Sequence, residues 1–229
     1  HDVNRALFGT ITDAIIRNVG LTGGLTSIKG YGNTGVLVGM AVSNSTIENS
    51  YSMGNVESIS LAAGGLVGRL ETDSTVTSSF STAQVKSGEM AGGLVGRLYI
   101  DNQISDSFAT GAVSSLDHTG GIVGYSVSSG SISNSFSSGY VQGGRYYGGL
   151  IGFLFGEITA NSYWAVDASG QEESASDSED SGYIGLSLEK LQCGTEENTS
   201  YINSDCLSVD GAEEGFDNFV TVFESWNLN

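Results

Sequence analysis

Six carboxylates lie close together in the last third of the chain, and carboxylate oxygens are the ligands that Ca²⁺ prefers in proteins. They are Asp167, Glu172, Glu173, Asp177, Glu179 and Asp180. The segment lacks the ligand spacing of an EF-hand loop. We therefore interpret it either as a calcium-binding loop, which makes calcium the one candidate cofactor, or as a solvated acidic run.

The chain has two cysteines, Cys193 and Cys206, and both follow this acidic segment. A disulfide between them would close a short loop and stabilise it by about 3 kcal/mol in the chain-entropy model. Two free thiols and a metal-bound pair are the alternatives, although a metal site would need more ligands nearby.

Catalytic chemistry has few candidates. The chain has two histidines and no His-Glu-x-x-His pair from which a protease zinc site could be built. We expect His118, beside Asp117, to lie in an exposed turn.

A glycosidase or lyase would need paired carboxylates with nearby cations on one face. The candidates before position 165 are Asp101, Asp106, Asp117, Arg97 and Arg145. They fall in different repeats and turns, so a polysaccharide-active enzyme is the alternative rather than the leading hypothesis.

A repeated pentapeptide must position these side chains. Gly64-Gly65-Leu66-Val67-Gly68 recurs at 92–96, 120–124 and 148–152, and a variant at 35–39 carries Val36 at the second glycine. The last glycines of the five copies stand at positions 39, 68, 96, 124 and 152, so the copies are evenly spaced. A fixed period of about 28 residues indicates a solenoid.

A second motif, Ile47-Glu48-Asn49-Ser50-Tyr51, follows each glycine motif with related copies at 76–80, 104–108, 132–136 and 158–163. With a strand period of two, Ile47 and Tyr51 are expected to point into the coil, and Glu48 and Ser50 out of it. A valine at 56, 85, 113 and 141 suggests a third strand. The pattern predicts an all-β solenoid of about five to six coils, each of about 28–30 residues, with three short strands per coil. It occupies residues 1–164, and residues 165–229 form an irregular acidic cap.

Identical positions in stacked coils are expected to form ladders. The predicted core ladders are Leu37, Leu66, Leu94, Ile122 and Leu150, then Ile47, Val76, Ile104, Ile132 and Ile158, and the aromatic stack of Tyr51, Phe80, Phe108, Phe136 and Tyr163. The predicted outward ladder carries the hydroxyls of Ser50, Ser79, Ser107 and Ser135. It could bind glycans, order water as ice-binding solenoids do, or simply be a solvated face.

Four tyrosines, Tyr99, Tyr140, Tyr146 and Tyr147, are expected in turns of neighbouring coils. They could stack on sugars, or they could cover the coil edges.

Composition excludes several classes of function. The chain has 34 glycines, no proline and a net charge of -18. Residues 1–164 hold 11 acids and 7 bases, whereas residues 165–229 hold 15 acids and only Lys190. Nucleic acid is therefore not an expected partner, since phosphate binding depends on clustered Lys and Arg. There is no apolar run long enough to span a membrane and no signal-peptide pattern at the start.

The two half-repeats resemble the GLUG motif, a repeat of bacterial surface proteins, large adhesins and the non-catalytic part of M26 immunoglobulin A1 proteases. The resemblance covers about 160 of the residues. Leu7-Phe8-Gly9 with Ile16 to Leu21 resembles the first repeat of such arrays, although the strand usual before it is missing. Asn161 to Asp167 with Gly170-Gln171 resembles their closing segment.

The resemblance implies a β-helix-like solenoid on a secreted or cell-surface bacterial protein, with further domains in a longer parent chain. Our leading hypothesis is a non-enzymatic adhesive or spacer module whose partner is a host or environmental glycan or protein. Any M26-like protease activity would lie elsewhere in such a parent.

Overall fold

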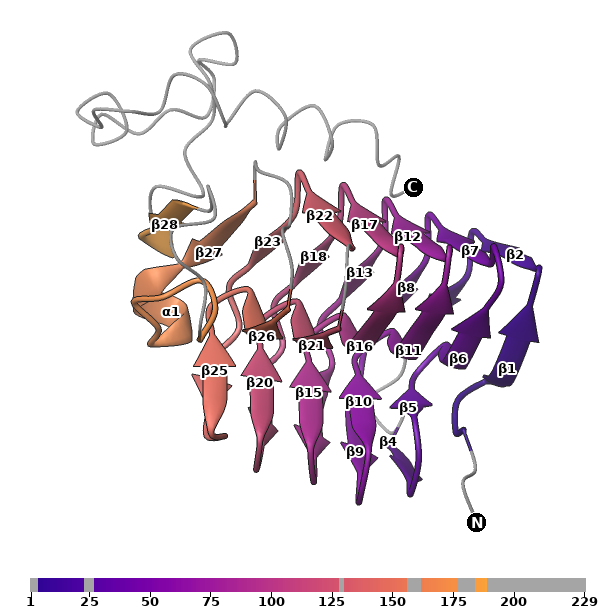
Figure 1. The fold of residues 1–229 in the computed structure, drawn as a ribbon, viewed down its shortest axis with the longest axis horizontal. Coiled ribbons are helices and arrows are strands. Elements are labelled where there is room, and N and C mark those ends of the chain that lie inside the picture. The colour runs from indigo at the N-terminus through magenta and orange to yellow at the C-terminus, as the bar shows by residue number, and fades with distance from the viewer. Residues whose placement is uncertain (1–3, 23–26, 128–129, 156–161, 177–183, 189–229) are drawn as a thin grey trace, which may run out of the picture.

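In the computed structural model the chain folds into a β-solenoid of about five turns, almost without helix, which confirms the predicted fold class. The structure describes residues 4–22, 27–127, 130–155, 162–176 and 184–188. Figure 1 shows equivalent strands of successive coils side by side, from the indigo N-terminal end to the orange end. Among the described residues, no helix is long and apolar enough to cross a membrane.

Each complete coil contributes strands to five parallel sheets, so the prediction of three strands per coil is wrong. Sheet A contains β5 (Thr34–Gly35), β10 (Ala62–Gly64), β15 (Met90–Gly92), β20 (His118–Gly120) and β25 (Tyr146–Gly148). Sheet B contains β1 (Phe8–Thr12), β6 (Val38–Val42), β11 (Val67–Thr72), β16 (Val95–Ile100), β21 (Val123–Ser126) and β26 (Ile151–Leu154).

The chain then passes through the remaining three sheets. Sheet C contains β2 (Ile15–Arg17), β7 (Thr46–Glu48), β12 (Thr75–Thr77), β17 (Gln103–Ser105) and β22 (Ser131–Ser133). Sheet D contains β3 (Gly20–Leu21), β8 (Tyr51–Ser52), β13 (Phe80–Ser81), β18 (Phe108–Ala109), β23 (Phe136–Ser137), β27 (Tyr163–Ala165) and β28 (Ile184–Leu186). Sheet E contains β4 (Ser27–Gly30), β9 (Asn55–Ser58), β14 (Gln84–Ser87), β19 (Val113–Ser115) and β24 (Val141–Gln142).

The register of these sheets follows the sequence period, because Val67 pairs with Val38 on one side and with Val95 on the other. The aliphatic ladder at 37, 66, 94, 122 and 150 is fully buried, as predicted, and so are Ile47, Val76, Ile104 and Ile132. Ile158 lies outside the described residues. The valines at 56, 85, 113 and 141 are also buried, and those at 56, 85 and 113 form a second, smaller core with Ala63 and Ala91.

The motif glycines serve close approach of backbones. A Cβ on Gly64 would collide with the carbonyl oxygen of Val67 and lie 2.6 Å from the nitrogen of Gly96 in the next coil. The described glycines with positive φ are Gly54, Gly143, Gly144 and Gly170, and all four lie outside the repeated motif. The motif therefore makes the tight crossing from sheet A to sheet B, where a side chain has no room.

The corners on either side of sheet C use polar residues in the left-handed region instead. Between sheets C and D these residues are Asn18, Asn49, Ser78, Asp106 and Asn134, with φ between 46° and 57°. Asn and Asp tolerate this conformation better than other side chains. Such a residue interrupts the strand alternation, so the residue after it points into the coil rather than out of it.

This interruption overturns the prediction of an outward hydroxyl ladder. Ser50, Ser79, Ser107 and Ser135 have exposed fractions of 1%, 0%, 2% and 0%, so they point inward. The predicted aromatic stack exists, but it lies on the outer face of sheet D rather than in the core. Its rings run from Tyr51 through Phe80 and Phe108 to Phe136 with centroids 4.8, 4.7 and 5.0 Å apart. Tyr163 continues the register opposite Phe136 and is buried.

The described part of the C-terminal segment continues the stacking. Strand β27 spans residue 164, where the solenoid was predicted to end. Helix α1 (Val166–Ser169) follows it, and the next residues lie along the last coil. The nitrogens of Gly149 and Leu150 donate to the carbonyl oxygens of Glu173 and Ser174, at 2.8 and 3.0 Å. These bonds satisfy donors of the last coil that would otherwise form an open sheet edge.

Candidate ligand-binding groove

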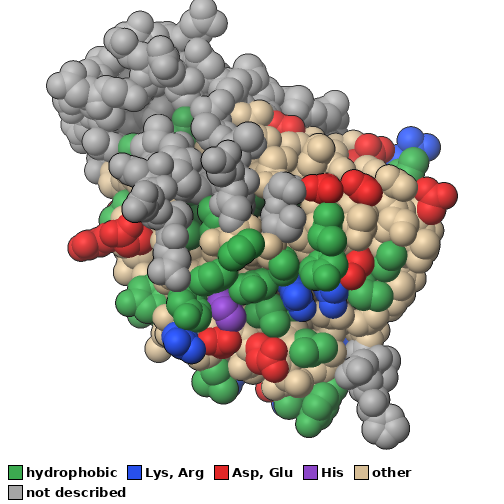
Figure 2. Space-filling model, in the orientation of Figure 1, with side chains coloured by type: hydrophobic (Ala, Val, Ile, Leu, Met, Phe, Trp, Pro, Cys, Tyr) green, Lys and Arg blue, Asp and Glu red, His purple; other side chains and the backbone are tan. Residues whose placement is uncertain are grey.

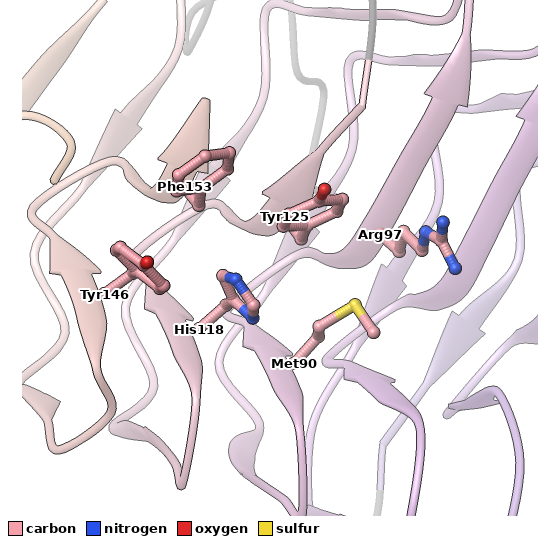
Figure 3. Close-up of a pocket in the computed structure, with 6 residues that line it drawn as sticks. All are labelled: Met90, Arg97, His118, Tyr125, Tyr146 and Phe153. Carbon is pink, nitrogen blue, oxygen red and sulfur yellow. The ribbon is translucent and has the colours of Figure 1, made fainter. Parts of the chain in front are cut away.

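A groove runs along the outer surface where sheet A meets sheet B. Its sheet A wall is the column Met90, His118 and Tyr146, which stand opposite one another in β15, β20 and β25. Its sheet B wall is the column Arg97, Tyr125 and Phe153, from β16, β21 and β26. These six side chains line a cavity of about 340 Å³ (Figure 3). In Figure 2 hydrophobic side chains gather around one histidine, with basic side chains beside them.

Strand alternation explains why these side chains point outward. In sheet A the residues Ala91 and Thr119, next to Met90 and His118, are fully buried. In sheet B, Leu98 next to Arg97 is buried in the same way. The glycine motif between the two strands of each coil brings the sheets into a close corner, so the two outward columns face a shared space.

The rings form two platforms set at a steep angle to each other. His118 stacks on Tyr146 with centroids 5.1 Å apart and an interplanar angle of 16°, and Tyr125 stacks on Phe153 at 5.4 Å and 11°. Across the groove the rings meet edge to face, with angles of 72° between His118 and Tyr125 and 70° between Tyr146 and Phe153. Figure 3 shows the two rows of rings, with Met90 and Arg97 at one end. Both edge-to-face and stacked contacts are favourable for aromatic rings.

Arginines adjoin the rings. The guanidinium carbon of Arg97 lies 5.6 Å from the Tyr125 centroid and 5.5 Å from that of Tyr99. Arg69 lies 5.1 Å from the Tyr99 centroid, and its Nε faces a carboxylate oxygen of Glu71. Burial, and then the charge of Arg69, lower the pKa of Arg97. Arginine nevertheless keeps its charge at physiological pH.

His118 does not lie in an exposed turn as predicted. It belongs to β20, its side chain is 13% exposed, and its Nδ1 lies 3.1 Å from a carboxylate oxygen of Asp117. Burial lowers the pKa of His118, the charges of Arg145 and Arg97 lower it further, and Asp117 opposes them. The imidazole is therefore mostly neutral at pH 7 and serves as an aromatic wall.

The predicted tyrosine cluster does not exist as one surface. Tyr146 lies in the groove, whereas Tyr140 lies beside the outer face of sheet E, in a depression with Gln84, Lys86 and Gln142. Tyr147 follows Tyr146 in β25 and so points away from the groove; it is 47% exposed. Tyr99 contacts Arg69 and Arg97 at the end of the groove.

Sequence reasoning missed three residues of the groove, Met90, Tyr125 and Phe153, and placed a fourth, His118, in an exposed turn. Each is in strand register with another lining residue one repeat away, because His118 follows Met90, Tyr125 follows Arg97 and Phe153 follows Tyr125. This recurrence of large side chains at equivalent positions is the signal that could have marked the two columns.

The serines predicted as a ligand face hold the coils together instead. The Oγ of Ser79 donates to the carbonyl of Thr77 at 2.7 Å and accepts from the nitrogen of Ser50 at 3.1 Å. Ser107 repeats this pattern with Ser105 and Ser79. Because these serines are buried and each hydroxyl donates and accepts a hydrogen bond inside the coil, they present no surface to a glycan.

The acidic segment is only partly described. Asp167, Glu172 and Glu173 are exposed, and Oδ1 of Asp167 accepts from the nitrogens of Ala168 at 3.0 Å and Leu188 at 2.7 Å. Asp177, Glu179 and Asp180 lie outside the described residues, and so do Cys193 and Cys206. Within the described part of the chain, no group of three or more His, Cys, Asp or Glu side chains could hold a metal. Calcium binding and the disulfide therefore stay predictions.

The carboxylates considered for catalysis occupy separate places. Asp101 and Asp106 stand at the two different corners beside sheet C, where Asp106 accepts from Nδ2 of Asn134 at 3.2 Å. This contact joins equivalent corners of two adjacent coils. Asp117 pairs with His118.

Fold and groove together define a parallel β-solenoid with an aromatic and cationic groove along its axis. No protein-family model, no curated protein and no solved structure matches this chain.

Proposed function

We propose that this chain is a non-catalytic adhesive segment of an exported bacterial surface protein, of the GLUG type, and that it binds a glycan in the groove between sheets A and B. The observation that carries the proposal is the pair of aromatic platforms, His118 with Tyr146 and Tyr125 with Phe153. A sugar ring has an apolar face of C–H groups, which packs on an aromatic face, and a rim of hydroxyls, which stays in water or meets polar groups. A groove with aromatic walls and a few polar groups suits such a ligand.

Removing one ring of a platform tests this proposal. Phe153→Ala deletes a half-buried ring from the groove, and we expect it to weaken glycan binding about tenfold or more, by analogy with aromatic anchors at other interfaces. Phe155→Ala is the matched control, because Phe155 lies just beyond the groove in the same chain segment and is 65% exposed. Binding is measured on a glycan array and then by calorimetry, with and without EDTA.

Three results would contradict the proposal. One is a panel of neutral and acidic oligosaccharides in which the wild-type chain binds none. Another is release of new reducing ends or unsaturated products during the incubation, which would favour the polysaccharide-active enzyme. The third is binding that EDTA abolishes, with Phe153→Ala unchanged, which would move the site from the groove to the acidic segment.

A further inference from the structure

Arg69 and Arg97 occupy equivalent positions in adjacent coils but have different partners. They stand opposite each other in β11 and β16. Two positions further along each strand the repeat differs, with Glu71 in one coil and Tyr99 in the next. Glu71 provides the carboxylate that Arg69 faces. Tyr99 provides a ring face instead, and it lies near both guanidinium groups.

Arg97 is consequently a half-buried cation without a carboxylate partner in the part of the chain that the structure describes. Its Nε is buried and meets no hydrogen-bond acceptor among the residues that the structure describes. The charge of Glu71 raises the pKa of Arg97 by less than the charge of Arg69 lowers it. A partly desolvated guanidinium gains most from a ligand that brings its own carboxylate or sulfate, since two N–H groups can bind such an oxyanion side by side.

The groove also has a direction and a repeat. Its two columns run along the solenoid axis, and successive coils are about 4.8 Å apart. This spacing is close to the length of one pyranose residue in an extended glycan chain. A linear glycan lying along the groove would therefore place one sugar over the rings of one coil and the next sugar near the following coil.

We propose that the ligand of the groove is an extended acidic glycan, with one carboxylate or sulfate bound by Arg97 while neighbouring sugars stack on the rings of Tyr125 and Phe153. This inference rests on the proposed function and adds the charge of the ligand and its orientation. The other charged groups that act on Arg97 or His118 are Arg69, Glu71, Asp117 and Arg145, and Glu89 directly precedes Met90 in the chain. Glu71 is engaged by Arg69, and Asp117 lies beside His118. Arg145 is exposed, with its guanidinium carbon 5.1 Å from the Tyr146 ring centroid, so Arg97 is the one cation among the six residues that line the cavity.

The experiment compares an oligogalacturonate hexamer with the same hexamer as its methyl ester, both in EDTA so that calcium bridges do not contribute. Calorimetry with the full chain is expected to give about 10- to 100-fold tighter binding of the acid, the range for a hydrogen-bonded charge pair. A sulfated hexasaccharide of a neutral sugar distinguishes sulfate from carboxylate as the preferred anion. Arg97→Gln should remove the difference between acid and ester, and Arg97→Lys should retain part of it. Arg17→Gln, which removes an exposed charge from sheet C, should leave it unchanged.

The comparison of acid with ester uses the wild-type chain. It therefore tests the inference even if Arg97→Gln does not fold. Equal binding of acid, ester and sulfate would overturn the inference and leave the proposed function intact. Binding of hexaglutamate in place of every sugar would overturn both proposals and indicate an acidic peptide as the partner. No binding of any of these probes would likewise overturn both.

Discussion

Ser50, Ser79, Ser107 and Ser135 each join two neighbouring coils through the same pair of hydrogen bonds. Each hydroxyl donates to the carbonyl two positions earlier and accepts from the backbone nitrogen of the equivalent residue in the preceding coil, which is Val19 for Ser50 and a serine for the other three. That nitrogen is buried at a corner where the strand ladder is interrupted, so the serine supplies the acceptor that a strand would have supplied.

Ser107→Ala should therefore cost about 1–3 kcal/mol of unfolding free energy, because the buried nitrogen of Ser79 and the carbonyl of Ser105 each lose a partner. Urea unfolding followed by circular dichroism measures the loss as a lower midpoint. Ser133→Ala is the control, since Ser133 is half-exposed on sheet C and its hydroxyl has no partner among the described residues. Equal midpoints for the two variants would show that the serine ladder contributes no stability.

At the scale of elements, the glycine motif and the left-handed corners decide which faces are buried. The apolar ladders and the coil period could be predicted from the sequence, because Leu94 and Ile104 repeat with their neighbours at fixed spacing. The inward direction of Ser107 could not be predicted, because a strict strand period of two assumes that Asp106 is extended. Asp106 has a φ of 51°, which ends the alternation there. A polar residue between two short apolar stretches at every repeat is the signal for such a corner.

The groove was missed for a related reason. Assigning His118 and Tyr146 to turns hid the fact that both belong to strands of sheet A, in register with Met90. Nothing within one repeat indicates that sheets A and B meet at a close corner with their outward columns facing a common space. That geometry requires glycine at 92 and 120, because a Cβ at either position would collide with the backbone of the following coil.

The corner residues can be tested at Ser78, which holds a φ of 46° where three of the other four coils carry Asn and one carries Asp. Ser78→Asn should raise stability by a few tenths of a kcal/mol up to about 1 kcal/mol, because Asn adopts the left-handed conformation more readily. Ser78→Val should lower it by about 1–2 kcal/mol. Urea midpoints measure both changes, and Ser114→Val, on strand β19, is the control. Equal effects of valine at 78 and 114 would contradict a strained corner.

At the scale of the whole molecule, charge is distributed unevenly. The net charge of -18 belongs mainly to residues 165–229, whereas residues 1–164 hold 11 acids and 7 bases. A polyanionic ligand is therefore repelled at long range but meets a cation at Arg97. Salt at physiological strength screens charges beyond about 8 Å, so it reduces the long-range repulsion more than the half-buried contact. Binding of an acidic glycan should consequently survive moderate salt better than binding to an exposed basic patch.

The stack is stabilised by contacts between neighbouring coils, since no single coil buries its own apolar face. Leu94, fully buried between Leu66 and Ile122, lies in the middle of its core ladder. Leu94→Ala should cost about 2–5 kcal/mol because it leaves a cavity that rigid neighbouring coils cannot close. Leu116→Ala is the control, because Leu116 is 81% exposed and surface changes stay within about 0.5 kcal/mol.

The same variant shows whether the coils unfold together. The third glycine motif, residues 92–96, has a neighbouring coil on each side. If both interfaces share the loss of stability, amide hydrogen exchange should accelerate in β11 and in β21 to the same extent. Urea unfolding should then show one transition of unchanged slope. Faster exchange confined to β16, or two separate transitions, would mean that the coils are coupled more weakly than their continuous ladders require. Leu94 is suited to this measurement because its backbone nitrogen donates to Ile122 while its carbonyl accepts from Leu66 and Val67, so the cavity borders both interfaces at once.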